Sequence, residues 1–224
     1  MANTFTQNTA PRAAGLIGDS PPRLVLNDGG QVGVAKQFTW LSKPLASAYI
    51  GTAFISDIGI RGSHWRSDGT TWAPVGGRVV LGTGSGLSVS ANSTTKESLV
   101  SITIPAGLIG ANGHLEVTHF WSFTNSANTK TFTVELGGTA FFNVAHTANA
   151  IFLPPPTCIW NNNSETSQIA FAATNGNSTV ATSTAATTAS LDTTLSQVLT
   201  ITGTKATGTE TITLAGYTVE LVRA

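Results

Sequence analysis

The stretch that decides the fold runs from Ile104 to Leu136 and reads IPAGLIGANGHLEVTHFWSFTNSANTKTFTVEL. Apolar and polar residues alternate on both sides of a polar segment at 125–130, which is typical of two strands that each bury one face. One face of the first strand carries Leu115, Val117, His119, Trp121 and Phe123, and one face of the second carries Phe132, Val134 and Leu136. The pattern predicts a two-stranded hairpin at the heart of a β-sandwich.

A turn at Ser126 and Ala127 would place Trp121 opposite Phe132 and His119 opposite Val134. The register of this predicted hairpin is strongly specified, because a slip of one residue would turn both apolar sets to the wrong face. The outward side is then expected to be a flat, hydroxyl-rich surface without a cluster of catalytic groups, made of Thr118, Ser122, Thr131, Thr133 and Glu135.

The composition indicates a protein whose surface is partly covered by neighbours. Charged residues make up only 10% of the 224 residues, well below the roughly 25% of an ordinary soluble domain. The mean hydropathy is +0.14. With 11 basic and 11 acidic residues the formal net charge is +0, which argues against a nucleic-acid binder, because such proteins concentrate positive charge on one face.

The single cysteine, Cys158, excludes a disulfide within the chain. It follows Pro154-Pro155-Pro156 with no partner nearby in sequence, so a packed thiol is favoured over a nucleophile. We find no secretory signal and no apolar run near the ~20 residues that a membrane helix needs. The sequence therefore predicts a soluble chain made in the cytoplasm.

Glycine, proline and serine divide the chain into four predicted parts. Residues 1–35 are expected to form an extended N-terminal anchoring arm, with a disordered tail as the alternative. Residues 36–79 are expected to form a small Trp-rich β unit, and residues 80–95 a Gly/Ser-rich connector. Residues 96–224 are expected to form a C-terminal antiparallel β-sandwich of jelly-roll type, which makes the predicted class all-β.

Short apolar runs predict the strands of that sandwich. A change of phase at Ala215-Gly216 predicts a β-bulge. The low-complexity segment 175–190 is expected to be a mobile or interface loop. The predicted strands span 99–104, 113–123, 130–136, 139–144, the neighbourhood of Ile159, 168–172, 195–201 and 209–222.

Within the small unit, Asp68-Gly69 predicts a turn that joins 64–66 and 71–75 in a hairpin, with Trp65 and Trp72 supporting each other. The alternative is a patch of Arg61, His64, Trp65 and Arg66 that binds sugar or nucleic acid. Spaced glycines at 82–86 resemble a phosphate loop, but no Lys-Ser/Thr pair follows them.

The four histidines do not form a chelating set in the sequence: they are His64, His114, His119 and His146. His114 and His119 are five residues apart, which sends them to opposite faces of a strand. We expect His119 to be a packed, hydrogen-bonded residue. The alternative is an ion held by His119 at a symmetry axis.

Glu116 and Glu135 are expected to point outward on adjacent strands of the hairpin. A glycosidase pair would need a cleft that raises one pKa, and no cleft-forming insertion surrounds them, so we interpret both as solvated. Sequons at Asn92, Asn162 and Asn177 carry little weight without a secretory signal. We therefore predict no catalytic, cofactor-binding or metal-binding residues, no cofactor, and no enzymatic activity.

Two stretches give the chain a resemblance to known proteins. The first comprises 104–113, Trp121-Ser122-Phe123-Thr124-Asn125-Ser126-Ala127-Asn128 and Leu136-Gly137-Gly138-Thr139. It resembles β-sandwich domains of tailed-bacteriophage virion proteins. The second, 57–60 to 67–72, resembles a short module of phage fibre and decoration proteins.

The resemblance implies a homotrimer whose N-terminal arm docks on the virion. The partner of residues 1–35 would be the major capsid protein or another virion protein, and assembly would occur in the host bacterial cytoplasm. A capsid decoration or head-fibre protein is favoured, because the chain has no heptads or fibre repeats. The alternatives are a tail-fibre or receptor-binding protein that contacts a host glycan, and a carbohydrate-processing enzyme. Nucleic acid and membrane insertion are not expected.

Overall fold

The chain divides into two units, residues 1–35 and 36–224, in a computed structural model that describes residues 24–26, 32–34, 36–170 and 186–223. In the first unit β1 (Leu24–Leu26) pairs antiparallel with β2 (Val32–Val34). The rest of the predicted arm lies outside the described residues.

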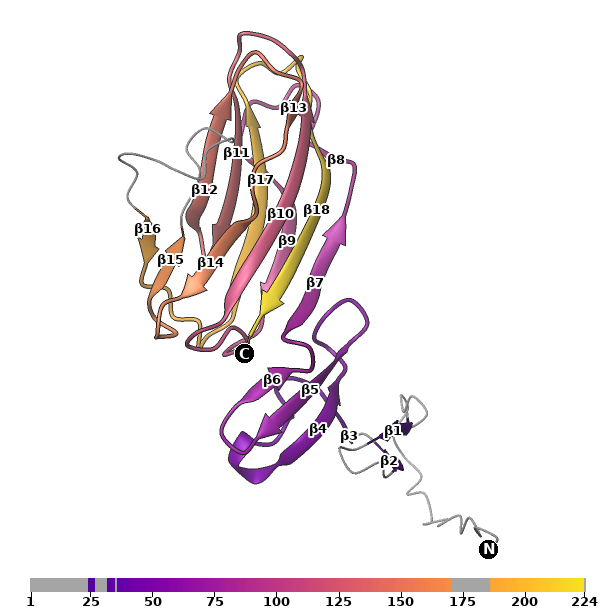
Figure 1. Cartoon of the computed structure of the whole chain (residues 1–224). Helices are drawn as coiled ribbons and strands as arrows, with labels where there is room; N and C mark the ends of the chain where they lie inside the picture. The colour runs from indigo at the N-terminus through magenta and orange to yellow at the C-terminus, as the bar shows by residue number, and fades with distance from the viewer. Residues whose placement is uncertain (1–23, 27–31, 35, 171–185, 224) are drawn as a thin grey trace, which may run out of the picture. The chain divides into compact units, whose positions relative to one another are not determined.

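The second unit contains a sandwich of two antiparallel sheets that pack face to face (Figure 1). The eight-stranded sheet contains β7 (Arg78–Gly84), β8 (Leu87–Ser88), β10 (His114–Phe123), β13 (Ile151–Phe152), β14 (Thr157–Asn161), β15 (Gln168–Ala170), β16 (Thr187–Ala189) and β18 (Ile212–Val222). The four-stranded sheet contains β9 (Glu97–Ile104), β11 (Lys130–Leu136), β12 (Thr139–His146) and β17 (Gln197–Lys205). The predicted all-β class and antiparallel sandwich are confirmed.

Strands β10 and β11 do not form the predicted hairpin. β10 pairs with β13, β14 and β18 in one sheet, and β11 pairs with β12 and β17 in the other. The segment 124–129 therefore crosses from sheet to sheet as an arch. Sheets pack about 10 Å apart, which a connection of this length can span. A hairpin and an arch both bring the two apolar sets together, so alternation alone did not distinguish them.

Phe132 of β11 is the centre of the aromatic core. Its ring lies 4.7 Å from that of Trp121, 5.1 Å from Phe123 and 5.5 Å from Phe152, measured between centroids. Phe132 is fully buried and Trp121 is 1% exposed. The predicted proximity of Trp121 and Phe132 is thus correct, but it arises across the sandwich and not along one sheet.

β18 lies between β10 and β7 and contains the predicted bulge. Phe120 pairs with Gly216 and Trp121 with Leu214, so Ala215 is the extra residue. Most of the low-complexity segment lies outside the described residues, but its end forms β16, which pairs with β15. The prediction of a loop was therefore wrong for Thr187–Ala189.

The Gly/Ser-rich stretch predicted as a connector, residues 80–95, is partly strand: residues 80–84 belong to β7 and Leu87–Ser88 form β8. β7 pairs with β18 along its length, and β8 pairs with it further on. The glycines serve close packing: a Cβ on Gly84 would lie 2.8 Å from Cε1 of Tyr217, and one on Gly82 would lie 2.5 Å from Cδ1 of Ile102. Glycine in a strand interior often marks such close approach, which composition alone does not separate from a flexible linker.

Residues 36–74 form a small four-stranded sheet with the order β3 (Lys36–Phe38), β4 (Ile50–Ile55), β5 (Ser63–Asp68), β6 (Trp72–Pro74). A short 3₁₀ helix, η1 (Ala46–Ala48), precedes β4. The predicted hairpin is confirmed as β5 and β6. Its turn is held by Asp68, whose Oδ1 accepts hydrogen bonds from the backbone N–H groups of Thr70 and Thr71.

Aromatic rings fill the small sheet and join it to the sandwich. Trp65 packs on Trp40 at 4.8 Å, and Trp72 stacks on Tyr49 at 5.3 Å. The indole N–H of Trp40 donates to the carbonyl of Ala106 at 2.8 Å. Trp40 therefore contributes both to the core of the small sheet and to its attachment to the loop before β10.

We expect Phe132→Ala to lower the free energy of unfolding by about 3–5 kcal/mol, because it leaves a cavity where four aromatic rings meet. Equilibrium denaturation with urea measures the change. Phe120→Ala, at a β10 residue that is 41% exposed, is the matched control and should cost no more than about 0.5 kcal/mol. Equal effects of the two substitutions would contradict this account of the core.

Candidate functional site

The outer face of the eight-stranded sheet carries a cluster of titratable side chains. Register places Glu116 of β10 beside Cys158 of β14 on one side and beside Glu220 of β18 on the other. Arg78 of β7 reaches across β18, and its guanidinium lies 2.8 Å from the carboxylate of Glu220 and 2.9 Å from that of Glu116. The pKa of Arg78 is raised, first by Glu116 and then by Glu220. This ion-pair network connects three neighbouring strands.

His114, Glu116 and Cys158 are described residues that could hold a metal ion, since one ligand atom from each lies within 4.8 Å of the other two. Imidazole, carboxylate and thiolate are zinc ligands. Glu116, however, already binds Arg78, and burial, aided by the charge of Glu116, raises the pKa of the Cys158 thiol. The thiol is therefore protonated at neutral pH, and we interpret Glu116 as a member of the ion-pair network beside the neutral thiol of Cys158.

Sequence reasoning missed this cluster. Cys158 has no partner nearby in the sequence, whereas the β10–β14 register brings it next to Glu116. The only local signal was that His114 and Glu116, two residues apart, share one face of a strand. Glu116 and Glu135 do not share a surface, because β10 and β11 belong to different sheets; Glu135 instead pairs with Lys96. The expected continuous surface from Thr118 to Glu135 is likewise divided between two outer faces, and Thr133 is buried.

His119 is the packed histidine that the sequence predicts. It is fully buried on the inner face of β10, 4.8 Å from the ring of Phe142. Its Nδ1 accepts a 2.7 Å hydrogen bond from the indole N–H of Trp121, and its Nε2 lies 3.4 Å from the hydroxyl of Thr157. Burial lowers its pKa to about 4. Both ring nitrogens face partners in the core, which leaves neither directed at a symmetry axis.

The remaining two histidines, His64 and His146, pack against aromatic rings. His64 lies on β5 against Phe54 at 5.3 Å, and His146 lies 4.2 Å from the ring of Phe152. Trp65 is fully buried. The alternative in which Trp65 forms part of a sugar- or nucleic-acid-binding patch is therefore wrong.

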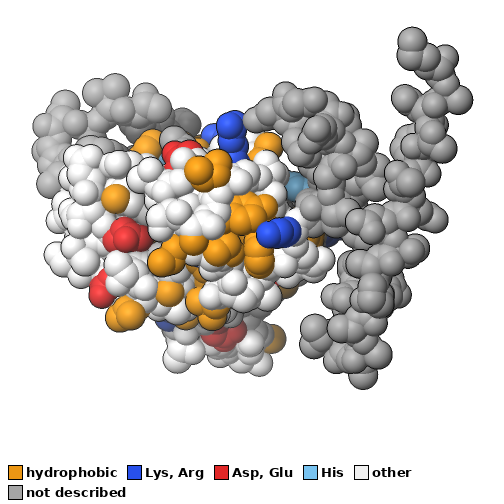
Figure 2. Space-filling view, turned by 90° about the horizontal axis from the view of Figure 1, so that it is seen from below, with side chains coloured by type: hydrophobic (Ala, Val, Ile, Leu, Met, Phe, Trp, Pro, Cys, Tyr) orange, Lys and Arg blue, Asp and Glu red, His pale blue; other side chains and the backbone are white. Residues whose placement is uncertain are grey.

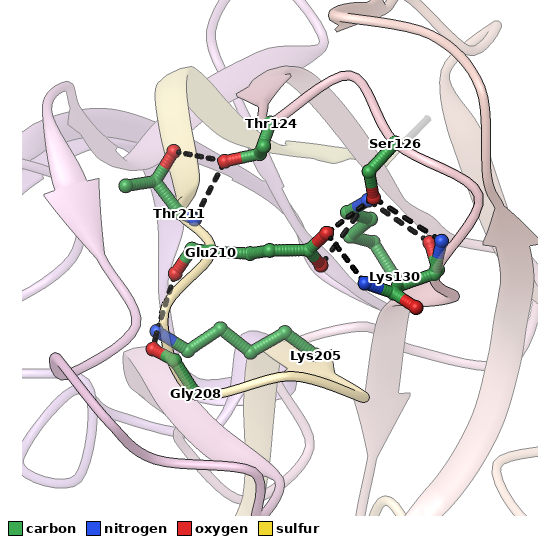
Figure 3. Close-up of polar contacts among 8 residues, drawn as sticks. Thr124, Ser126, Lys130, Lys205, Gly208, Glu210 and Thr211 are labelled. Carbon is green, nitrogen blue, oxygen red and sulfur yellow. Dashed lines mark hydrogen bonds and ion pairs between the residues drawn. The ribbon is translucent and has the colours of Figure 1, made fainter.

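A buried polar network not predicted from the sequence lies at the arch (Figure 3). Lys130 is fully buried and Lys205 is 1% exposed. The ammonium of Lys130 lies 3.2 Å from the carboxylate of Glu210 and donates to the carbonyl of Asn128 at 2.9 Å. Lys205 donates to the backbone carbonyls of Glu210 and Gly208 at 2.7 and 3.1 Å.

Ser126 completes this network. Its hydroxyl donates to Glu210, and this bond is the main reason that the pKa of Glu210 is lowered. Buried charges are costly unless they are paired and hydrogen-bonded. The network thus holds the arch to the turn between β17 and β18, and it is structural.

Exposed apolar side chains gather on the small sheet and its loops. Figure 2 shows hydrophobic side chains near the middle of the face seen from below. The small-sheet apolar set consists of residues that are each 55% exposed or more: Leu41, Leu45, Ile50, Ile60 and Val75. A contiguous exposed apolar surface is typical of a protein that associates with another surface, whereas single exposed apolar residues are normal.

A shallow hollow of about 490 Å³ lies beside Trp160 at the end of β14. We call it the Trp160 hollow. It is lined by Asn112, Trp160, Asn161, Asn162, Asn163 and Ile169. No charged residue belongs to its lining, so it is a neutral site with amide groups around an aromatic ring.

Comparison with known proteins places the chain in no family. No protein-family profile matches it, and no curated protein sequence matches it. The crystal structure of the infectious bursal disease virus VP2 subviral particle aligns with 15% identity and a TM-score of 0.34, over 71% of this chain and 39% of that chain. The structure of the Gx strain of this virus aligns with 13% identity and a TM-score of 0.23, over 71% and 47%.

The chain thus spans less than half the length of both solved chains. Structural similarity at these TM-scores and identities does not establish a shared function. What the fold defines is a class: an all-β protein with an antiparallel sandwich and a small appended sheet. In the described residues no helix is long and apolar enough to span a membrane.

We expect the unfolding free energy to fall as the pH drops from about 6.5 to about 4. In that range an unfolded His119 binds a proton that the folded one, with its pKa of about 4, does not. The loss approaches about 3 kcal/mol at the lower limit. His119→Gln should reduce this slope, because the amide can still accept from Trp121 without titrating.

Urea denaturation between pH 4 and pH 7 measures the slope for both proteins. Burial also lowers the pKa values of His114 and His146, and their contribution is present in both proteins. The comparison therefore isolates His119. An unchanged slope in the variant would show that His119 is not the titrating group.

Proposed function

We propose that this chain is a non-enzymatic structural protein of a bacteriophage virion. In this proposal it is a homotrimeric capsid decoration or head-fibre protein, assembled in the host cytoplasm and attached through residues 1–35. The observation that carries the proposal is the small-sheet apolar set, which follows the N-terminal unit directly in sequence and leaves five large hydrophobic side chains in solvent. The low share of charged residues, 10% of the chain, agrees with partial coverage of its surface by neighbours.

The attachment proposed here has two components. Residues 1–35 would supply main-chain hydrogen bonds and apolar contacts to the shell, losing conformational entropy as they become ordered. A trimer would present three such segments at a high effective concentration, so weak single contacts would add to a stable attachment. The small-sheet apolar set would dock on the same surface.

A tail-fibre or receptor-binding protein is the second candidate. Its support is the Trp160 hollow, since an exposed aromatic ring with amides beside it suits contact with host glycans. Electron microscopy of particles carrying a labelled chain separates the two candidates: label over the shell supports decoration, and label at the tail tip supports host attachment. Label at neither place would contradict both.

Deletion of residues 1–30 should leave a folded trimer that no longer joins particles, because the arm is proposed to make the attachment. Sedimentation of the purified variant checks the trimer, and co-sedimentation with particles lacking the protein checks attachment. The full chain is the control. Normal occupancy by the truncated chain would refute a role for the arm.

The double substitution Leu45→Ser/Ile50→Ser should raise the dissociation constant for particles about tenfold or more, which corresponds to a loss of about 1.4 kcal/mol of binding free energy and lowers occupancy below saturation. Both side chains are 78% exposed, so stability should change by no more than about 0.5 kcal/mol. Ile151→Ser, at a residue of β13 that is 66% exposed, is the matched control. Equal occupancy of the two variants would exclude this set from docking.

A further inference from the structure

Trp160 differs from the other tryptophans in exposure and in hydrogen bonding. The other four of the five tryptophans in the chain, Trp40, Trp65, Trp72 and Trp121, are at most 4% exposed, and each indole N–H donates to an acceptor. Trp160 is 42% exposed. In the part of the chain that the structure describes, no acceptor receives its indole N–H. A large ring with an unused donor is thus presented to solvent.

The ring of Trp160 is held in place from one side. It stacks on the imidazole of His114 with a centroid distance of 3.7 Å and an interplanar angle of 25°, and His114 is itself only 7% exposed. The backbone of Trp160 pairs with His114 on one side and with Ile169 on the other. Ile169 is partly exposed and lines the hollow together with Trp160. The exposed part of the ring therefore borders the hollow, and the stacking on His114 fixes its orientation before any ligand arrives, which lowers the entropic cost of binding.

Asn161 builds the floor of the Trp160 hollow. Its amide donates to the carbonyl of Gly110 at 2.8 Å and to the hydroxyl of Thr193 at 2.9 Å, and its oxygen accepts from Gln168 at 3.0 Å. With a 2% exposed side chain and all these contacts made, Asn161 is not available to a ligand. It fixes the end of β14 on which the hollow is built.

The remaining amides of the hollow are available. Asn112, Asn162 and Asn163 are exposed, and none of their side chains has a hydrogen-bond partner among the described residues. Each amide offers two donor hydrogens and an acceptor oxygen. Asn163 has a positive φ of 56°, a conformation that asparagine tolerates better than most residues. The backbone therefore explains why residue 163 is an asparagine. Asn162 does not have a positive φ, so this explanation does not apply to it.

We propose that the Trp160 hollow binds a neutral saccharide. One face of a pyranose ring presents C–H groups that pack on an indole, and its hydroxyls need both donors and acceptors, which Asn112, Asn162 and the indole N–H supply. The lining contains no charged residue, so it matches an uncharged sugar and not a sialic acid or a uronic acid. A nucleic-acid base would also stack on Trp160, but its phosphates require cations that the hollow lacks.

This inference deepens the host-attachment candidate and rests on it for its biological meaning. The binding itself can be measured without particles. A failure of sugar binding therefore leaves the docking proposal standing, and a failure of docking leaves the sugar site standing.

Saturation-transfer difference NMR on the full chain tests the proposal. The probes are methyl glycosides of glucose, galactose, mannose and N-acetylglucosamine, each at millimolar concentration, with N-acetylneuraminic acid as the charged comparison. At least one neutral glycoside should show transfer that is strongest on the ring protons of one face. The acidic sugar should show at least tenfold weaker binding.

Four variants locate the site. Trp160→Ala should weaken binding at least tenfold, Trp160→Phe should retain it within about threefold because an aromatic face remains, and Asn162→Ala should weaken it several-fold. Phe120→Ala is the matched control and should bind as the parent chain does, because Phe120 is as exposed as Trp160 and also lies on the outer face of the eight-stranded sheet.

The proton NMR spectrum of Trp160→Ala, recorded in the same experiment, shows whether this variant is folded, and retention of binding by Trp160→Phe then assigns the loss to the aromatic face. The proposal is overturned by the absence of transfer to every neutral glycoside, by equal binding of Trp160→Ala and the parent chain, or by loss of binding in Phe120→Ala. Tighter binding of an oligonucleotide than of any glycoside would also overturn it.

Discussion

The packing of Phe132 against Trp121 across the sandwich is the contact on which the rest of the structure depends. The two residues belong to different sheets, and their rings lie 4.7 Å apart. Because they face each other through the core, the chain between them must cross from one sheet to the other. The buried ion pair of Lys130 and Glu210 follows from this crossing, since the arch takes a lysine into the interior, where it needs a charged partner.

The same arrangement separates structural polar groups from accessible ones. His119 and Lys130 face inward with their hydrogen bonds made inside the protein. Arg78 and Glu116 lie on an outer face and pair with each other. The amides beside Trp160 are different, because those of Asn112 and Asn162 remain without a described partner. A polar group that the fold leaves unused at the edge of a rigid ring is better evidence for a binding site than the number of polar groups on a surface.

Much of the fold could be predicted from local sequence, whereas strand pairing and the clusters that depend on it could not. Alternation located β11 at Lys130–Leu136, and a change of phase located the bulge at Ala215. Alternation reports which face a residue occupies but not which strand lies beside it, so the β10–β11 hairpin was wrong. For the same reason, the proximity of His114, Glu116 and Cys158 could not be predicted, because it depends on the β10–β14 register.

The solvent exposure of individual side chains could not be predicted from the sequence either. Five tryptophans look alike in the sequence, and only the three-dimensional neighbours show that Trp160 alone is open to solvent. The glycines of β7 gave a related error, since their close approach to Tyr217 and Ile102 has no local signature that differs from a linker. Whether a residue is exposed or closely packed at such positions depends on the strands beside it. No single segment of the sequence encodes which strands those are.

The position of β18 has a consequence for synthesis of the protein. This strand, Ile212–Val222, lies between β10 and β7 and pairs with both, so it joins β7 to the rest of the eight-stranded sheet. A nascent chain on the ribosome carries β7 for more than 100 residues, and β10 for almost 90, before their shared neighbour is translated. The sheet can be completed only after residue 222 has left the exit tunnel, so a chain whose translation stops before β18 leaves the facing edges of β10 and β7 unpaired, and unpaired edges favour aggregation.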